Sequence, residues 1–455
     1  MSISPRIFRN FFMLYVYFPT IKIYNCSCNK LSKVFVKKNM KKLIMTALTI
    51  FISASFANAE KITWDKIVSL TKEQNPSIQT AKLKLDNAKL SYDKALSGYL
   101  PDVSLGGKAS QGESDDKFSR SYSYGLNASL SIFSGFGTYN DIKQKSADLK
   151  AAQAAYDRAV SDTAYDAAAQ YVNLMWAYET AELSKRILER RTENKDMINL
   201  KYNSGNVDIG SLKRVEADVE LSSYDLRKAQ RYTETASAAL MKTIGRKDNA
   251  VLETDERIIL NERSVVKEDF NSLITKIPEF LIAQYNINSY EALSAKAKSV
   301  WLPEIGLSGS LGRSGNEWTP DKNSWNAGLS ISYPLFTGTR IADTKTAANQ
   351  LKIAEENLKN VSNQLKASAI TNYNNLQDSL ENIAAREYYL AASQQQAEIS
   401  QRKYVNGLSS YQDWYSIEND YISSQRTILD TKRAAALEKA KWHNFIGDGF
   451  VQPGK

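Results

Sequence analysis

The sequence has 455 residues, a formal net charge of +9 and a single histidine, His443. Residues 1–59 hold nine Lys or Arg and no Asp or Glu, so 50 basic and 50 acidic residues remain from Glu60 onward. This balance excludes a broad basic surface for nucleic acid, and we expect no nucleic-acid partner. Both cysteines precede Glu60, which leaves no disulfide, no thiolate metal site and little acid–base chemistry. We therefore expect no enzyme, no cofactor and no metal site.

Residues 40–59 have the pattern of a secretory signal peptide. A short lysine pair, a long apolar run and the small-residue cleavage motif Ala57-Asn58-Ala59 follow one another. An uncleaved membrane anchor is the alternative. Residues 1–39 fit no part of a signal and are interpreted as an upstream extension. The mature chain is therefore expected to be exported.

The exported part contains one unit twice, at a spacing of 202 residues. The halves at 60–245 and 278–447 are separated by a linker at 246–277 and followed by a tail at 448–455. This spacing is too long for a solenoid repeat, whose period is about 20 to 50 residues. It predicts a duplicated architectural half instead. The matching positions include Pro76 and Pro278, Pro101 and Pro303, Gly205 and Gly407, and Gly245 and Gly447.

One long predicted helix dominates each half. Residues 139–204 and 341–406 contain neither Pro nor Gly over 66 residues each, and they are rich in Ala, Leu, Lys, Glu and Gln, which favour helix. At 1.5 Å per residue each helix would be roughly 100 Å long. In the first of them, apolar residues recur at spacings of three, four, five or seven. This pattern favours close packing against neighbouring helices.

A glycine follows each long helix, Gly205 in the first half and Gly407 in the second. Glycine can adopt the left-handed conformation that the turn of a helical hairpin requires. A second helix is predicted after each turn, at 208–244 and at 409–446. Each half is thus expected to contain a helical hairpin with a glycine at its tip.

Pro101 and Pro303 mark the predicted change from helix to strand, because proline has no amide donor for a continuing helix. A further helical stretch of 23 residues precedes each proline. Together, the two shorter helices of a half nearly match the long one in length. We therefore expect them to run end to end alongside it.

Two β-hairpins are predicted, at 102–134 and 303–336, because apolar residues alternate there with Gly, Ser, Asn and other small or polar residues. This pattern is typical of membrane-spanning strands that face lipid on one side and water on the other. Strands of a soluble β-sandwich also alternate, which is the alternative. Aromatic residues near the hairpin ends favour the membrane, where such residues form interfacial girdles. These residues include Tyr99, Phe133, Trp301 and Phe336.

Four strands per chain cannot close a barrel, since the smallest spanning barrels use about eight. An open sheet edge would leave backbone groups without partners in hydrocarbon. The chain is therefore expected to form oligomers, with eight strands in a dimer or twelve in a trimer. The small residues on the polar face suit a wide aqueous lumen. They favour a homotrimer with a 12-stranded barrel in contact with outer-membrane lipid.

Over residues 60–450 the sequence resembles the TolC-like outer-membrane efflux protein family. The resemblance lies in the order, duplication and spacing of several short segments. These are Tyr99-Leu100-Pro101, Trp301-Leu302-Pro303, Phe133-Ser134-Gly135, Pro334-Leu335-Phe336-Thr337-Gly338, Tyr202-Asn203-Ser204-Gly205 and Tyr404-Val405-Asn406-Gly407.

The resemblance implies an α+β membrane protein in which a long antiparallel α-helical barrel continues a transmembrane β-barrel built by several chains. It implies a passive channel-tunnel that crosses the outer membrane of a Gram-negative bacterium and extends into the periplasm. Such a tunnel docks onto a periplasmic adaptor and an inner-membrane pump, in an efflux or type I secretion system. Residues 246–277, with the tail after 447, would form an equatorial belt. A periplasmic coiled-coil adaptor or scaffold is the alternative, although it has no need of the hairpins.

The resemblance also suggests site residues. Gly205 and Gly407 would be the hairpin tips that meet the adaptor, the alternative being turns without a partner. Asp413 lies where family members often carry a tunnel-entrance carboxylate, and three copies would form an anionic ring. The first half has Ser211 at the matching position and Asp208 nearby, so a solvated surface Asp413 is the alternative. The exported cargo, whether drug, metal ion or polypeptide, is left open.

Overall fold

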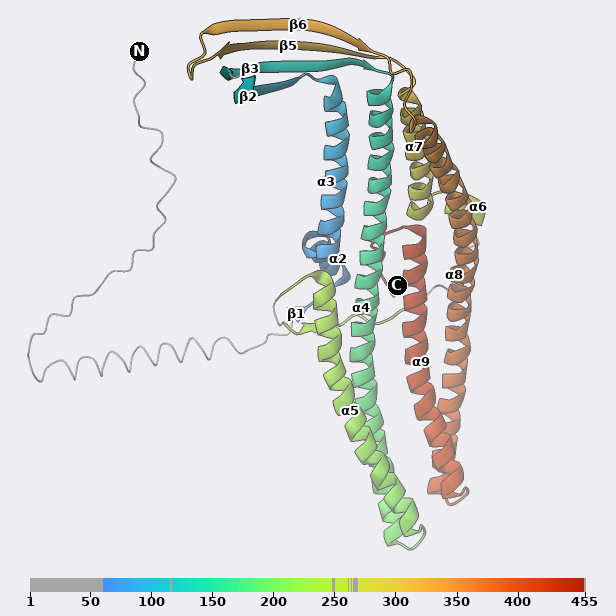
Figure 1. Cartoon of the computed structure of the whole chain (residues 1–455). Coiled ribbons are helices and arrows are strands. Elements are labelled where there is room, and N and C mark those ends of the chain that lie inside the picture. Colours follow the sequence, from blue (N-terminus) through green and yellow to red (C-terminus); the bar gives the residue numbers. More distant parts are fainter. Residues whose placement is uncertain are drawn as a thin grey trace, which may run out of the picture. The chain divides into compact units, whose positions relative to one another are not determined.

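Long helices make up most of the described chain, and they lead into one β-sheet (Figure 1). The structure is a computed structural model and describes residues 60–453, except 115–116, 248–249, 261, 263 and 265–268. The predicted signal peptide and upstream extension lie outside these residues. Among the described helices, none combines the length and the apolar character that crossing a membrane would require.

Four helices form two hairpins. The first pairs α4 (Gly137–Asn203) with α5 (Ile209–Ile244), and the second pairs α8 (Arg340–Val405) with α9 (Tyr411–Ile446). These bounds lie within two residues of the predicted ones. Gly245 and Gly447 end α5 and α9 with φ of 89° and 83°, a left-handed conformation that glycine adopts without a steric penalty.

The shorter helices stack end to end. In space, helix α3 (Pro76–Leu96) begins next to the end of α5, and α7 (Pro278–Ser299) begins next to the end of α9. Asn75 fixes the first junction, because its Nδ2 donates to the Thr243 carbonyl at 2.6 Å while its Oδ1 accepts from two backbone N–H groups of α3. Figure 1 shows each stacked pair running alongside a long helix, as expected from the matching lengths.

The linker packs against the middle of the helices. Strands β1 (Glu60–Lys61) and β4 (Leu252–Glu253) pair in parallel. With α2 (Trp64–Gln74) they cover a buried cluster on α4, α5 and α9. The short helix α6 (Phe270–Ile274) packs on α8 instead, in a separate cluster. The linker therefore packs on the helices near the level where the stacked helices meet.

Four antiparallel strands form the sheet in the order β2-β3-β5-β6. Their bounds are β2 Asp102–Ser114, β3 Lys117–Ser134, β5 Glu304–Gly315 and β6 Lys322–Ser332. Apolar residues share one face in register across the strands, and Gly, Ser, Asn and Lys share the other. The apolar rows are Leu105, Leu126, Leu311 and Trp325; Leu130, Leu307 and Leu329; and Ile305 with Ile331, while a polar row is Ser104, Asn127, Ser310 and Asn326.

One detail of the predicted alternation is wrong. Strict alternation puts Ile132 on the apolar face and Phe133 on the polar one. A β-bulge between Ser131 and Phe133 makes Phe133 the register partner of Ile305, on the apolar face. The cause is the extra residue, which shifts the side-chain alternation by one position.

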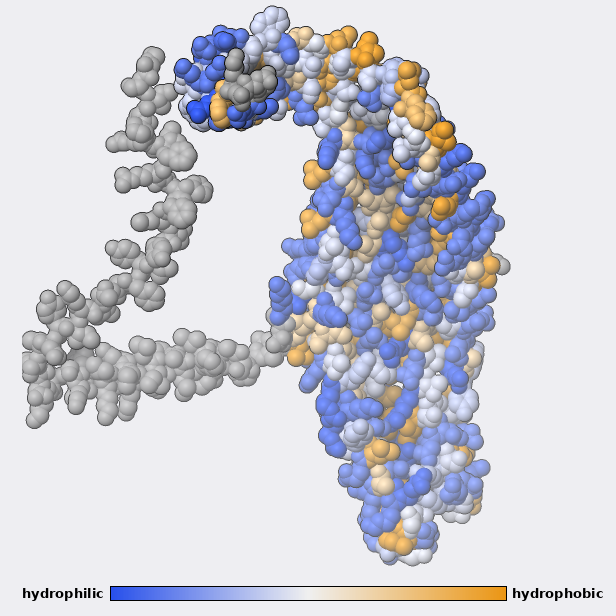
Figure 2. All heavy atoms as spheres, viewed as in Figure 1, coloured by the Kyte–Doolittle hydropathy of each residue, from blue (hydrophilic) through white to orange (hydrophobic). Residues whose placement is uncertain are grey.

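Both sides of this unit end in exposed edges. Strands β2 and β6 each have one neighbour in the sheet. Helix α3 on one side and α8 on the other carry exposed apolar side chains, such as Leu83 and Leu90 on α3 and Ile353 and Tyr388 on α8. Figure 2 shows further hydrophobic surface where β6 runs into α8. The molecule thus presents two lateral edges, each continuous from strand to helix.

The helix junction gives a stability prediction. A Cβ at Gly245 would lie 2.5 Å from the Gln74 carbonyl oxygen, whereas a Cβ at Gly205 would meet no atom within 4 Å, although both residues have positive φ. We expect Gly205→Ala to lower the free energy of unfolding by about 1 kcal/mol and Gly245→Ala by at least about 2 kcal/mol more. Unfolding of detergent-solubilised protein measures both. Equal losses would contradict the close approach at Gly245.

Candidate functional site

The two hairpin tips lie at the end of the helices opposite the sheet (Figure 1). Gly205 and Gly407 turn the chain there with φ of 76° and 74°. The backbone N–H of Asn206 donates to the Lys201 carbonyl at 2.9 Å, and that of Leu408 donates to the Lys403 carbonyl at 2.8 Å. The two glycines are thus required for their backbone conformation, and their surroundings are open.

The helix that leaves each tip is capped by the same pair of residue types in reversed order. Asp208 caps α5 and accepts from the backbone N–H and the hydroxyl of Ser211, at 3.0 and 2.8 Å, which holds the pKa of its carboxyl below the usual value. Ser410 caps α9, accepts from the backbone N–H of Asp413 and donates to its carboxylate at 2.7 Å. Asp413 is exposed and completes a capping box. Ser211 and Asp413 occupy matching positions but differ in type because the capping residue and the residue three positions later are swapped between the two helices.

Apolar side chains are exposed at both tips. Leu200 and Ile209 are exposed at the first tip, and Val405 and Leu408 are exposed at the second. The exposed fraction is 71% for Leu200 and 75% for Leu408. Gathered at the end of a helical hairpin, such side chains mark an interaction surface more often than scattered ones do. We call these four residues the tip surface.

An aromatic cluster lies beside the second tip, on the side toward the sheet. The rings of Tyr404 and Trp414 stack at 5.0 Å, and those of Tyr411 and Tyr415 stack at 5.5 Å. Lys201 crosses from the first hairpin, lies 4.8 Å from the ring centroid of Tyr404 and donates to its carbonyl at 3.2 Å. The cluster therefore holds the two tips together. The aromatic residues were visible in the sequence, but nothing there indicated that they meet.

A buried ion pair joins the two hairpins above the tips. Arg190 on α4 binds both carboxylate oxygens of Glu418 on α9, and Asn194 donates a further hydrogen bond to the same carboxylate at 3.0 Å. Glu418 is 1% exposed. A buried carboxylate is stable only when it is paired and hydrogen-bonded, so these contacts fix the register of α9 on α4.

Tyr415 links α9 to α5 on the neighbouring side. Its hydroxyl donates to the Asp218 carboxylate at 2.8 Å and accepts from Arg214 Nε at 3.1 Å. Arg191 approaches the same carboxylate at 3.5 Å. Sequence reasoning missed both sets of contacts, because their members lie about 200 residues apart and no motif connects them.

The predicted interfacial aromatics and the two prolines all lie near the junction of helices and sheet. Tyr99 ends a 3₁₀ helix (Ser97–Tyr99) and is half exposed. Phe133 lies near the end of β3, with its ring edge-on to that of Phe136. Trp301 faces Arg340 at 5.5 Å, and Phe336 is exposed after β6. Pro101 and Pro303 immediately precede β2 and β5, at the change from helix to strand.

Metal ligands are not grouped in the described part of the chain: no set of three or more His, Cys, Asp or Glu side chains is placed to hold an ion. His443 hydrogen-bonds Asp448 at 3.0 Å.

Comparison with known proteins identifies the family. The model of the outer membrane efflux protein family matches residues 67–246 and 271–441, that is, both halves. The chain belongs to this family. The resemblance to TolC-like proteins is thereby confirmed, together with the predicted combination of a long helical part and a β part.

Curated relatives cover most of this chain at low identity. The cation efflux system protein CusC of Escherichia coli O157:H7 is 21% identical over 403 residues, which span 85% of this chain and 86% of CusC. The outer membrane efflux protein BepC of Brucella suis biovar 1 is 20% identical over 349 residues, or 74% and 76% of the two chains.

Solved structures of outer-membrane channels share the fold. A CusC crystal structure has a TM-score of 0.76 at 18% identity and covers 84% of this chain and 91% of that one. The open state of the Neisseria gonorrhoeae MtrE outer membrane channel has a TM-score of 0.74 at 21% identity, with coverages of 86% and 90%. Membership of the outer membrane efflux protein family confirms the predicted outer-membrane location and the predicted role in efflux, and the solved channel structures show that the fold is shared.

The buried pair gives a second prediction. Arg190→Ala leaves Glu418 charged and buried without its main partner, so we expect the free energy of unfolding to fall by about 3 to 5 kcal/mol. Lys359→Ala breaks an exposed pair with Glu356 and should cost less than about 0.5 kcal/mol. Chemical unfolding in detergent compares the two variants. Similar small losses would show that Glu418 does not depend on Arg190.

Proposed function

We propose that three copies of this chain form a passive duct through which an inner-membrane pump expels its cargo. The observation that carries the proposal is the pair of lateral edges, β2 with α3 and β6 with α8. An unpaired strand edge is not tolerated in hydrocarbon, so each edge strand needs a partner from another copy. Three copies of a four-stranded sheet give twelve strands, enough for an aqueous lumen, whereas eight strands are filled by side chains.

The two faces of the sheet support a lipid side and a lumen side. Exposed Leu105, Leu311, Trp325 and Leu329 share the apolar face, which suits lipid. Small polar residues share the other face and leave room for water. Tyr99, Phe133, Trp301 and Phe336 lie near the junction of sheet and helices, where an aromatic girdle would meet the periplasmic interface.

Purification in detergent followed by native mass measurement tests the assembly. We expect extraction to require detergent, the particle to contain three copies, and the protein to conduct ions across a planar bilayer. A water-soluble monomer would favour the alternative of a periplasmic coiled-coil adaptor or scaffold. A stable dimer would refute the twelve-stranded duct.

The tip surface is proposed to dock onto a periplasmic adaptor. Gly205 and Gly407 set its two turns, and exposed Leu200 and Leu408 supply apolar contact area. The matched proteins are named efflux proteins and channels, which favours an efflux system over type I secretion. The name of CusC describes cation efflux by that protein. For the present duct, we propose that the pump selects the cargo.

Leu408 tests docking. Leu408→Asp places a charge in an apolar contact, so we expect adaptor copurification to fall at least tenfold and export to fall with it, while trimer mass and conductance stay unchanged. Leu408→Met keeps an apolar side chain of similar size and should retain docking. Wild-type copurification by Leu408→Asp would remove the second tip from the docking surface.

Asp413 is proposed to face the tunnel entrance, where three copies would form an anionic ring that favours cations. Its exposure beside the second tip supports this position. In single-channel recordings, Asp413→Ala should reduce cation preference, because three negative charges leave the pore, and Asp413→Glu should keep it. An unchanged preference in Asp413→Ala would leave the carboxylate with its capping role alone.

A further inference from the structure

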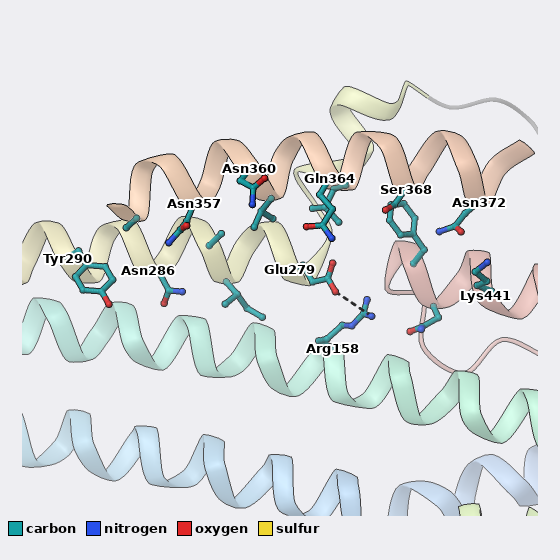
Figure 3. A pocket seen from close by; sticks show the side chains of 17 residues that line it. Arg158, Glu279, Asn286, Tyr290, Asn357, Asn360, Gln364, Ser368, Asn372 and Lys441 are labelled. Carbon is teal, nitrogen blue, oxygen red and sulfur yellow. Dashed lines mark ion pairs between the residues drawn. The ribbon is translucent and has the colours of Figure 1, made fainter. Parts of the chain in front are cut away.

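A recess of about 810 Å³ lies between α7 and α8, next to α4 and α9 (Figure 3). Its volume is in the range of small-molecule sites, about 300 to 1,000 Å³. Carboxamides dominate its polar lining. They belong to Asn286 on α7, to Asn357, Asn360, Gln364 and Asn372 on α8, and to Asn444 on α9.

Most of these amides have no protein partner. Within the described residues, the side chains of the five amides on α7 and α8 make no hydrogen bond to protein. Asn444 donates through Nδ2 to Asp162 at 3.2 Å, but its Oδ1 is buried and has no donor. Asn286, Asn357, Asn360 and Gln364 are exposed, so their donors and acceptors are accessible to a solute in the recess.

The charged side chains of the lining neutralise one another or nearby groups. Arg158 pairs with Glu279 at 3.4 Å across the recess and with Asp162 at 3.0 Å beside it. Lys441 pairs with Glu438 at 3.4 Å. The recess therefore offers many donors and acceptors without an unpaired charge, which favours a neutral ligand over an ion.

Part of the recess lies on the side of α8 that α6 leaves uncovered. Tyr373 of α8 contacts Phe270 of α6 at a ring distance of 5.8 Å, so α6 covers that side of α8. Gln364 precedes Tyr373 by nine residues, which is about two and a half helical turns and places it on the opposite side. In Figure 3, Asn357, Gln364 and Asn372 project from α8 toward the recess. In the proposed ring this side of α8 would line the duct.

We propose that this recess binds a neutral, hydroxyl-rich solute such as a short sugar chain. Each hydroxyl both donates and accepts, which matches uncommitted carboxamides. Tyr290, which is 36% exposed, offers a ring for the apolar face of a sugar unit. The location inside a duct rests on the proposed function, whereas binding itself does not.

Isothermal titration of the detergent-solubilised protein with maltohexaose, in an amine-oxide detergent without sugar head groups, tests the proposal. We expect saturable binding that the double variant Asn357→Leu, Asn360→Leu weakens about tenfold or more, since each lost hydrogen bond contributes about 1 kcal/mol. Asn363→Leu is the matched control, because Asn363 is exposed on the same helix but does not line the recess.

The comparison ligands are polyethylene glycol, which accepts but hardly donates, and a neutral Gly-Ser peptide of similar length. Neither is expected to compete with maltohexaose. Absence of sugar binding, an equal loss in Asn363→Leu, or tighter binding of either comparison ligand would overturn the assignment. Bilayer conductance is read separately: sugar binding without a pore refutes the duct alone, and a pore without sugar binding refutes the recess alone.

Discussion

Backbone hydrogen bonding at the sheet edges is the constraint on which this structure depends. In the sheet of one chain, β3 and β5 have partners on both sides, whereas β2 and β6 each leave a row of N–H and C=O groups unpaired. In hydrocarbon these groups have no water to bind. The same lateral edges continue into α3 and α8, which expose apolar side chains. Pairing between copies would therefore complete the sheet and the helical wall in one step.

The duplication makes such a wall simple to build, since each half supplies a hairpin of strands, a long helix and a stacked pair of shorter helices. The two halves differ at their hairpin tips. At the tips, Asp208 with Ser211 and Ser410 with Asp413 satisfy the same cap in opposite order. The fold thus keeps both helices capped while only the second half carries its carboxylate on the first turn of the helix. Both halves therefore meet the same need for a helix cap, although they place the negative charge at different positions.

Much of the fold could be predicted from local rules. The absence of Pro and Gly located α4 and α8, Pro101 and Pro303 located the entry into β2 and β5, and alternation located the apolar face of the sheet. The prediction failed at Ile132, because a bulge depends on how two strands align and leaves no clear trace in either one. The recess beside α8 was not predicted either. Most of its amides are spaced along α8, but the recess that they line also needs α4, α7 and α9.

By itself, the sequence determined the order and lengths of the elements, the duplication, the two-faced strands and the family resemblance, because propensity and periodicity are properties of neighbouring residues. Only the tertiary structure decided which distant residues meet. It placed Glu418 against Arg190 and Tyr415 against Asp218, and it gathered amides of α7, α8 and α9 around one recess. The two contacts join positions 228 and 197 residues apart, and the packing of helices that creates them is set by the whole core rather than by any local pattern.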